Sequence, residues 1–224
     1  MKKKSVYQNY FLMDVIEIQQ EDGSVKSTPH HCQGTTECSC HVYRWNYNDK
    51  IVISDIDGTI TKSDVLGLRL PIIGWDWTQP GVAALFTKIV NNGYRIVYLS
   101  ARPIGQASNT KEYLSSINLP DGPIFLNPTS MINATMSEVK GHSKEFKIDV
   151  LRKLKTLFPE TYNPFSGGFG NRETDVGAYQ AVGIPDPMIF TINPEGVVQH
   201  ELTTEFQTSY GSMASNIDQF FPPI

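Results

Sequence analysis

The sequence has little cysteine, no excess of positive charge and no long apolar run. Three cysteines in so short a stretch (Cys32, Cys38 and Cys40) argue against a secreted disulfide scaffold. The 19 lysines and arginines are outnumbered by 23 aspartates and glutamates, which argues against a nucleic-acid binder. No apolar run approaches the roughly 20 residues that span a bilayer, and the start lacks a signal-peptide core. These absences predict a soluble, intracellular globular protein.

Histidines surround the cysteines, so a zinc site is one interpretation of this stretch. Zinc-binding cysteines are usually separated by at least two residues, whereas Cys38 and Cys40 are separated by one. Such alternation is typical of a strand. We therefore favour two facing strands of a hairpin over a metal site here. The flanking histidines are His30, His31 and His41.

From residue 50 onward, strand and helix patterns alternate. Residues 51–54 form a continuous apolar run, typical of a strand buried on both faces of a parallel sheet. Further strands are expected at 95–100, 123–126 and 165–169, and helices at 80–92, 106–117, 143–158 and 174–182. This succession predicts a doubly wound α/β fold with a parallel sheet over residues 50–187.

Both ends of the chain are rich in strand patterns instead. These patterns lie at 14–45, 188–193 and 197–202. Neither end has enough strands to bury a hydrophobic face alone. We therefore expect residues 6–49 and 188–224 to pack together as one small β-sandwich.

Polar residues follow the expected strands at the edge where an α/β sheet binds its ligands. These residues are Asp55, Asp57, Ser100, Arg102, Asn171 and Asp175. Any one of them is explained as a turn former or a helix cap, but the set together is not. The sequence therefore predicts a functional site at this edge.

Asp55 and Asp57 are two residues apart on an extended segment, so their side chains point the same way. Like charges this close are costly unless a cation neutralises them or one carboxyl holds a proton. Carboxylate oxygens suit Mg²⁺, which proteins hold beside substrate phosphates. One aspartate is then able to attack phosphorus while the other protonates the leaving oxygen. Gly58 allows the backbone to turn, and its amide is expected to face a phosphate oxygen.

Lys147 lies on the apolar side of the helix expected at 143–158. At 100° per residue it falls within the apolar arc, whereas Arg152, Lys153 and Lys155 fall outside it. A lysine aimed at the sheet needs an anion, or its side chain must extend back to water. A phosphoryl group beside a nucleophilic carboxylate is such an anion, and a lysine that reaches solvent from the helix start is the alternative.

In order and spacing, these motifs resemble the haloacid dehalogenase (HAD) phosphatase superfamily. They are still more similar to the lipins, the Mg²⁺-dependent phosphatidate phosphatases. The segments that carry the resemblance are 55–67, 92–107, 119–123, 145–148 and 169–175. A weaker similarity to the amino-terminal segment of lipins covers 14–30. The resemblance implies a compact lipin with both parts fused.

The lipin resemblance implies a HAD-like catalytic domain at 50–187 beside an immunoglobulin-like sandwich formed by both chain ends. No large cap fits, because only 42 residues separate Asp57 from Ser100. Asp55 is implied to be the nucleophile and Asp57 the general acid and base. The implied Mg²⁺ site comprises Asp55, Asp57 through its backbone carbonyl, Asn171, and Asp175 as the residue that orients the metal ligands. The implied phosphate-binding residues are Gly58, Thr59, Ser100, Ala101, Arg102 and Lys147, although Arg102 is equally suited to brace the loop.

The implied function is hydrolysis of phosphatidic acid to diacylglycerol and phosphate, by a peripheral protein at the endoplasmic reticulum or nuclear envelope membrane. A non-catalytic phosphatidate-binding module and a HAD phosphatase for a soluble ester are the alternatives. A pure binder has no need of both Asp55 and Asp57. Membrane contact is expected from the basic, aromatic stretch after Lys2 or from Trp75 and Trp77, with a frayed terminus and core packing as the respective alternatives.

Overall fold

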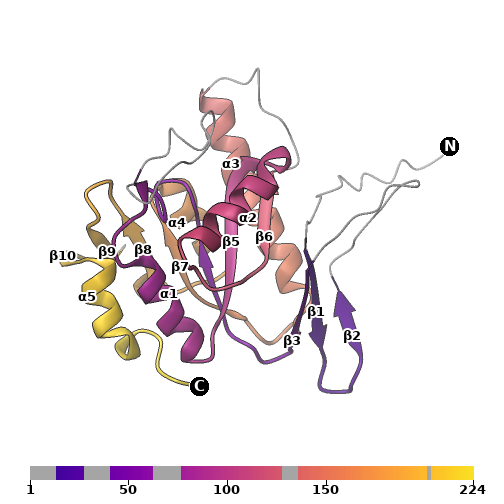
Figure 1. Cartoon of the computed structure of the whole chain (residues 1–224). Coiled ribbons are helices and arrows are strands. Elements are labelled where there is room, and N and C mark those ends of the chain that lie inside the picture. Colours follow the sequence, from indigo (N-terminus) through magenta and orange to yellow (C-terminus); the bar gives the residue numbers. More distant parts are fainter. Residues whose placement is uncertain (1–13, 28–40, 63–76, 128–135, 201–202) are drawn as a thin grey trace.

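The chain folds around a seven-stranded sheet (Figure 1). The computed structural model describes residues 14–27, 41–62, 77–127, 136–200 and 203–224. The strand order is β10-β9-β8-β7-β4-β5-β6. Strands β8, β7, β4, β5 and β6 run parallel to one another, and β9 and β10 add an antiparallel edge next to β8. The strands are β4 (Ile51–Ser54), β5 (Arg95–Pro103), β6 (Ile124–Asn127), β7 (Phe165–Gly170), β8 (Ile189–Ile192), β9 (Val198–His200) and β10 (Thr203–Thr208).

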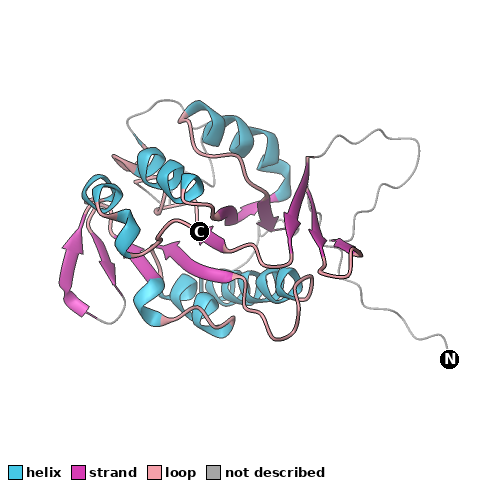
Figure 2. Ribbon diagram, turned by 90° about the horizontal axis from the view of Figure 1, so that it is seen from below, coloured by secondary structure: helices cyan, strands magenta, loops and turns pink. Residues whose placement is uncertain are grey.

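Helices cover both faces of this sheet, as Figure 2 shows. One hydrophobic core takes residues from α1, α2 and α5, and the other takes residues from α3 and α4. The helices are α1 (Val82–Asn91), α2 (Ala107–Ser116), α3 (Met136–Lys155), α4 (Glu173–Ala181) and α5 (Tyr210–Ser215). The expected α/β fold with a parallel-rich sheet is therefore confirmed, although α3 begins seven residues before the expected start at 143.

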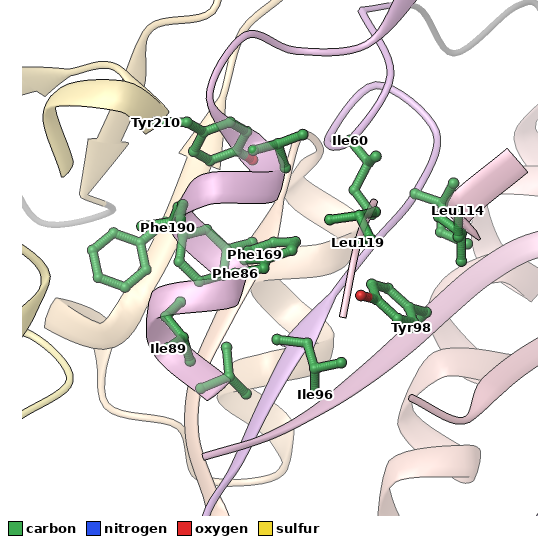
Figure 3. Packing of buried hydrophobic residues seen from close by; sticks show 14 of the residues in the cluster. Ile60, Phe86, Ile89, Ile96, Tyr98, Leu114, Leu119, Phe169, Phe190 and Tyr210 are labelled. Atoms are coloured by element: carbon green, nitrogen blue, oxygen red, sulfur yellow. The ribbon is translucent and has the colours of Figure 1, made fainter. Parts of the chain in front are cut away.

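Strand β4 lies in the middle of the parallel part of the sheet, between β7 and β5, and every one of its residues is apolar or small. Val52 packs into the core on the α1 side, whereas Ile51 and Ile53 pack into the core on the α3 side. All three are fully buried. On the α1 side, Phe86 and Phe169 meet edge to face with ring centroids 5.2 Å apart (Figure 3). Aromatic packing of this kind fixes the position of α1 on the sheet.

The sandwich expected from the two chain ends is not confirmed. Strand β8 pairs in parallel with β7, so the carboxy-terminal strands extend the main sheet instead. The amino-terminal strands form a separate sheet of order β2-β1-β3. A β-strand pattern records which residues are buried and does not choose the partner strand, so β8 was free to continue the parallel sheet. The three amino-terminal strands are β1 (Val15–Gln19), β2 (Val25–Ser27) and β3 (Val42–Asn46).

The expectation that the strands around the cysteine-rich stretch pair as a hairpin is wrong for the described residues, because β2 and β3 are not neighbours in the small sheet. Strand β1 lies between β2 and β3, antiparallel to the first and parallel to the second. Ile16 and Ile18 of β1 are more apolar than anything on β2, which is exposed throughout, so β1 takes the central place. The cysteines themselves, with His30 and His31, lie outside the described residues.

The small sheet is joined to the main domain by both apolar and polar contacts. Ile16, Ile18 and Trp45 belong to the same core as α3. Asp14 is fully buried and accepts a hydrogen bond from Lys111 Nζ on α2 at 2.6 Å. Burial of a carboxylate requires such a partner, so Asp14 ties the start of β1 to α2.

Candidate active site

The loop after β4 carries Asp55 and Asp57. The Asp55 amide donates to the Phe169 carbonyl at 2.9 Å, which extends the pairing of β4 with β7 into the loop. Gly58 then adopts a left-handed conformation, with φ of 84°, as expected for the turn. Its amide donates to Thr61 Oγ1 at 2.9 Å. The loop uses this donor itself in the structure, and the expectation that the amide faces a phosphate oxygen stays a prediction.

Two buried tyrosines brace this edge from outside the predicted motifs. Tyr210 of α5 donates its hydroxyl to the Thr59 carbonyl at 3.1 Å, across 151 positions of sequence. Tyr179 of α4 donates to the Phe169 carbonyl at 2.8 Å. Burial raises the pKa of both hydroxyls, which keeps them as neutral donors. Sequence reasoning missed both residues because an isolated tyrosine carries no motif.

Lys147 of α3 lies between two carboxylates. Its ammonium donates to Asp55 Oδ1 and to Asp175 Oδ1, each at 2.5 Å. All three side chains are almost fully buried. The helical periodicity thus placed Lys147 correctly on the sheet side of α3, and the anion it meets is the carboxylate pair. An uncompensated charge here would be very costly, so the three groups hold one another in place.

The electrostatics of Asp55 are set by burial. Burial raises the pKa of Asp55 to about 7, while the Lys147 ammonium opposes the rise and the carboxylates of Asp175 and Asp57 add to it. For Lys147, burial acts to lower the pKa, but Asp175 and Asp55 outweigh it and the pKa is raised. Lys147 is therefore charged at every working pH, whereas Asp55 in the metal-free protein titrates near neutrality.

This raised pKa predicts how the stability of the metal-free protein depends on pH. An unfolded aspartate loses its proton near pH 4, whereas folded Asp55 keeps it to about pH 7. Between these values the folded state binds the extra proton, so stability falls as pH rises, by up to about 1.4 kcal/mol per pH unit. Thermal unfolding in EDTA at pH 5 to 8 measures this slope.

Asp55→Asn is the reference for this experiment because asparagine does not titrate. The Tm of the wild type relative to that of Asp55→Asn is expected to decline from pH 5 to pH 7. Added Mg²⁺ needs the ionised carboxylate, so it should raise the wild-type Tm more at pH 8 than at pH 6. A constant difference between the two proteins across this range would contradict the assignment.

Asp57 is held by two residues of β5, Ser100 and Arg102. Both of its carboxylate oxygens accept from the Arg102 guanidinium, Oδ1 from Nη2 at 2.7 Å and Oδ2 from Nε at 2.8 Å. Ser100 Oγ donates to Asp57 Oδ2 at 3.0 Å. The structure therefore brings Asp57, Ser100 and Arg102 together, as the strand-end argument expects, but Arg102 contacts the carboxylate directly.

Asp175 shapes the loop after β7. Its Oδ2 accepts from the amides of Asn171 and Arg172 at 3.2 and 3.1 Å, and its Oδ1 accepts from Lys147. A carboxylate in the first turn also suits the positive end of α4. Gly170 is required here because a Cβ would lie 2.5 Å from the Asp175 Cβ. Asp175 thus orients the segment that carries Asn171.

The donor atoms at this edge fit a hard divalent cation. Asp55 Oδ2 and Asn171 Oδ1 each lie 3.4 Å from the buried Thr59 hydroxyl, so a carboxylate and an amide oxygen flank one point. Such oxygens suit Mg²⁺, whose remaining ligands are commonly backbone carbonyls, water and substrate. Within the described ranges, no three His, Cys, Asp or Glu side chains form a metal-binding group. A cation between these two oxygens would keep several positions for substrate and water.

The remaining sequence-predicted residues are placed as follows. The side chain of Ala101 is exposed on β5. Trp77 is 45% exposed, and Trp75 and the lysines near the start lie outside the described residues. No helix in the described part of the chain is long and apolar enough to cross a membrane.

A parallel sheet with paired aspartates at its carboxyl edge defines an α/β protein with a ligand site at that edge. Residues 14–222 match the family model LNS2 (Lipin/Ned1/Smp2). The chain belongs to this lipin family, which confirms the resemblance seen in its motifs.

Named relatives support this assignment. Phosphatidate phosphatase PAH1 of Arabidopsis thaliana and phosphatidate phosphatase LPIN2 of Homo sapiens are each 47% identical over 196 residues, or 85% of this chain and 22% of theirs. Phosphatidic acid phosphohydrolase 1 of Saccharomyces cerevisiae is 43% identical over 221 residues, or 91% of this chain and 25% of its own. The chain therefore spans about a quarter of the length of these curated relatives.

Solved structures align less closely. The D,D-heptose 1.7-bisphosphate phosphatase from B. bronchiseptica, complexed with magnesium and phosphate, aligns with a TM-score of 0.46 at 13% identity. The alignment covers 76% of this chain and 98% of that one.

Proposed function

We propose that this chain is a Mg²⁺-dependent phosphatidate phosphatase of the HAD type, which hydrolyses phosphatidic acid to diacylglycerol and phosphate at a membrane surface. The observation that supports this most is the buried pair of Asp55 and Lys147 at the carboxyl edge of the sheet. Asp57 follows Asp55 on the same loop, 18% exposed and open to an incoming ester. The names of the relatives point to the same substrate.

The first half of the reaction forms an aspartyl-phosphate. The Asp55 carboxylate attacks phosphorus and the bond from phosphorus to the diacylglycerol oxygen breaks. Asp57 donates a proton to that oxygen, so diacylglycerol leaves as an alcohol. Lys147 offsets the charge of the phosphoryl oxygens, and the Ser100 hydroxyl turns from Asp57 to donate to one of them.

The second half releases phosphate. Asp57, now a carboxylate, takes a proton from water as the water oxygen attacks phosphorus. The bond from phosphorus to the Asp55 oxygen breaks, and the free Asp55 carboxylate returns to its contact with Lys147. Asp55, Asn171 and the Asp57 backbone carbonyl would hold Mg²⁺. The cation, when bound, supplies positive charge to the phosphoryl oxygens.

The test is phosphate release from phosphatidate in mixed micelles, with Mg²⁺ or with EDTA. We expect release only with Mg²⁺, and diacylglycerol in equal amount. No release by folded protein that still binds phosphatidate-containing liposomes would support the alternative of a lipid-binding module. Release from soluble phosphate esters but not from phosphatidate would overturn the lipid substrate while leaving the chemistry intact.

Trp77 is the described residue best placed to touch a membrane beside the site. Its carbonyl accepts from the Lys62 amide at 2.7 Å, and a bridge between Thr61 and Thr78 joins the two segments. Tryptophan favours the membrane interface. Trp77→Ala is therefore expected to lower activity on phosphatidate vesicles by about tenfold, relative to activity on a short-chain phosphatidate dissolved as monomers.

Val42→Ala is the matched control for Trp77, because Val42 is an exposed apolar residue, 57% accessible, on the small sheet. This variant should keep the wild-type ratio between the two substrate forms. An equal loss by Trp77→Ala on both forms would show that Trp77 supports the loop and not the membrane contact.

We expect the membrane to be that of the endoplasmic reticulum or nuclear envelope, with peripheral attachment.

A further inference from the structure

Arg102 directs all three of its guanidinium nitrogens at protein groups. Nε and Nη2 hold the two oxygens of Asp57, and Nη1 donates to Thr110 Oγ1 on α2 at 3.2 Å. The Arg102 side chain is only 4% exposed, whereas Asp57 is 18% exposed. The guanidinium therefore lies behind Asp57, on the side away from solvent. An incoming ester meets the carboxyl group before it meets the arginine.

Thr110 fixes the guanidinium from the far side. Its hydroxyl is fully buried and donates to the Gln106 carbonyl at 2.8 Å, so its lone pairs face Arg102. The Arg102 amide also donates to Ser100 Oγ at 3.1 Å, and Ser100 in turn donates to Asp57. The backbone of Arg102 is thus bonded to Ser100, which holds Asp57, and its guanidinium is fixed between Thr110 and Asp57 itself.

We propose that Arg102 is a positioning residue for Asp57 and not a ligand of the substrate phosphate. A planar guanidinium that bonds both carboxylate oxygens fixes the plane of the carboxyl group as well as its place. A lysine would supply the charge but not the two-point geometry. The inference rests on the proposed role of Asp57 as general acid. The sequence leaves open whether Arg102 binds phosphate or braces the loop, and this inference develops the second alternative.

Positioning of Asp57 and binding of phosphate predict different losses of rate when the leaving group is changed. A misplaced general acid slows release of an alcohol, which needs a proton, much more than release of a thiol, which leaves as thiolate. A lost phosphate ligand slows both equally and raises KM. The experiment therefore compares phosphatidate with its analogue in which sulfur replaces the bridging ester oxygen. With the analogue, the bond from phosphorus to sulfur breaks and the thiolate leaves without a proton.

The measurement is kcat/KM for both lipids in Mg²⁺-containing mixed micelles, followed by phosphate and by thiol release. This quantity covers the steps up to departure of the leaving group and excludes hydrolysis of the aspartyl-phosphate. Arg102→Lys is expected to lower kcat/KM for phosphatidate by about 100-fold and for the sulfur analogue by less than about fivefold. Asp57→Asn should show the same selective loss, at least as large.

Two further variants complete the design. Thr110→Val removes the hydroxyl behind the guanidinium and should give the same selective loss, a few-fold in size, which keeps the test available if Arg102→Lys folds poorly. Arg95→Lys is the matched control, since Arg95 pairs with Asp49 at 3.0 Å on the opposite end of β5. It should leave both substrates at wild-type rates.

The outcomes distinguish failure of the positioning role of Arg102 from failure of the proposed function. Equal losses on both lipids with a raised KM in Arg102→Lys, beside a selective loss in Asp57→Asn, would make Arg102 a phosphate ligand and overturn the inference alone. An unselective loss in Asp57→Asn would overturn the acid role of Asp57 and with it the inference. No turnover of either lipid by the wild type would overturn the proposed function itself.

Discussion

Asp55→Asn is expected to reduce Mg²⁺-dependent phosphate release from phosphatidate by about 1000-fold or more. The amide has no charge to attack phosphorus and cannot form the aspartyl-phosphate. It nevertheless fills the same space beside Lys147, so the fold should survive. The measurement is phosphate release in mixed micelles at saturating Mg²⁺, with circular dichroism and thermal unfolding to establish that the variant is folded.

Asp14→Asn is the matched control for this experiment. Asp14 is also a fully buried aspartate bonded to a lysine, Lys111, but it lies at the junction of the small sheet with α2. Its replacement should lower the Tm and leave the rate per folded molecule near that of the wild type. If Asp55→Asn retains more than about a tenth of wild-type activity, Asp55 is not the nucleophile, because loss of a covalent nucleophile is far more damaging than this.

The core of the site could be predicted because its signals are local in the sequence. Four residues of β4 are buried and apolar or small, so the next residues must emerge at the carboxyl edge of the sheet. Asp55 and Asp57 follow at once. The inward direction of Lys147 followed from helical periodicity alone, and the structure places its ammonium on Asp55. The chemical roles of these residues stay predictions.

The contacts that hold the site could not be predicted, because they join segments far apart in the chain. The bond from Tyr210 to the Thr59 carbonyl depends on how α5 packs on α1, which no local pattern records. The pairing of Arg102 with Asp57 depends on the register of β4 against β5. From the sequence alone, an arginine at this strand end is equally suited to bind phosphate or to brace the loop, and the pattern does not record that its buried nitrogens face protein groups.

Lys147→Met is expected to be the most damaging change to the metal-free protein. It leaves Asp55 and Asp175 buried side by side without the ammonium that both contact. Removal of one partner from a buried ionic group commonly costs about 3–5 kcal/mol of folding free energy. Since Lys147 also opposes the rise in the Asp55 pKa, that pKa should climb further above 7. Activity should fall by about 100-fold or more at pH 7, with the acidic limb of the pH profile moved to higher pH.

Two matched lysine variants on α3 and one measurement decide between a charge effect and a general packing effect. Lys153→Met removes an exposed lysine, 55% accessible, whose surface pair with Asp149 is worth at most about 1 kcal/mol, so it should behave as the wild type. Lys147→Arg keeps a positive charge and should recover much of the stability.

Denaturant unfolding in EDTA and in Mg²⁺ is the measurement. Mg²⁺ should restore part of the stability lost by Lys147→Met, because a cation at Asp55 replaces part of the missing charge. Wild-type stability of Lys147→Met in EDTA would contradict this prediction, because it would show that the two carboxylates do not need the charge of the lysine.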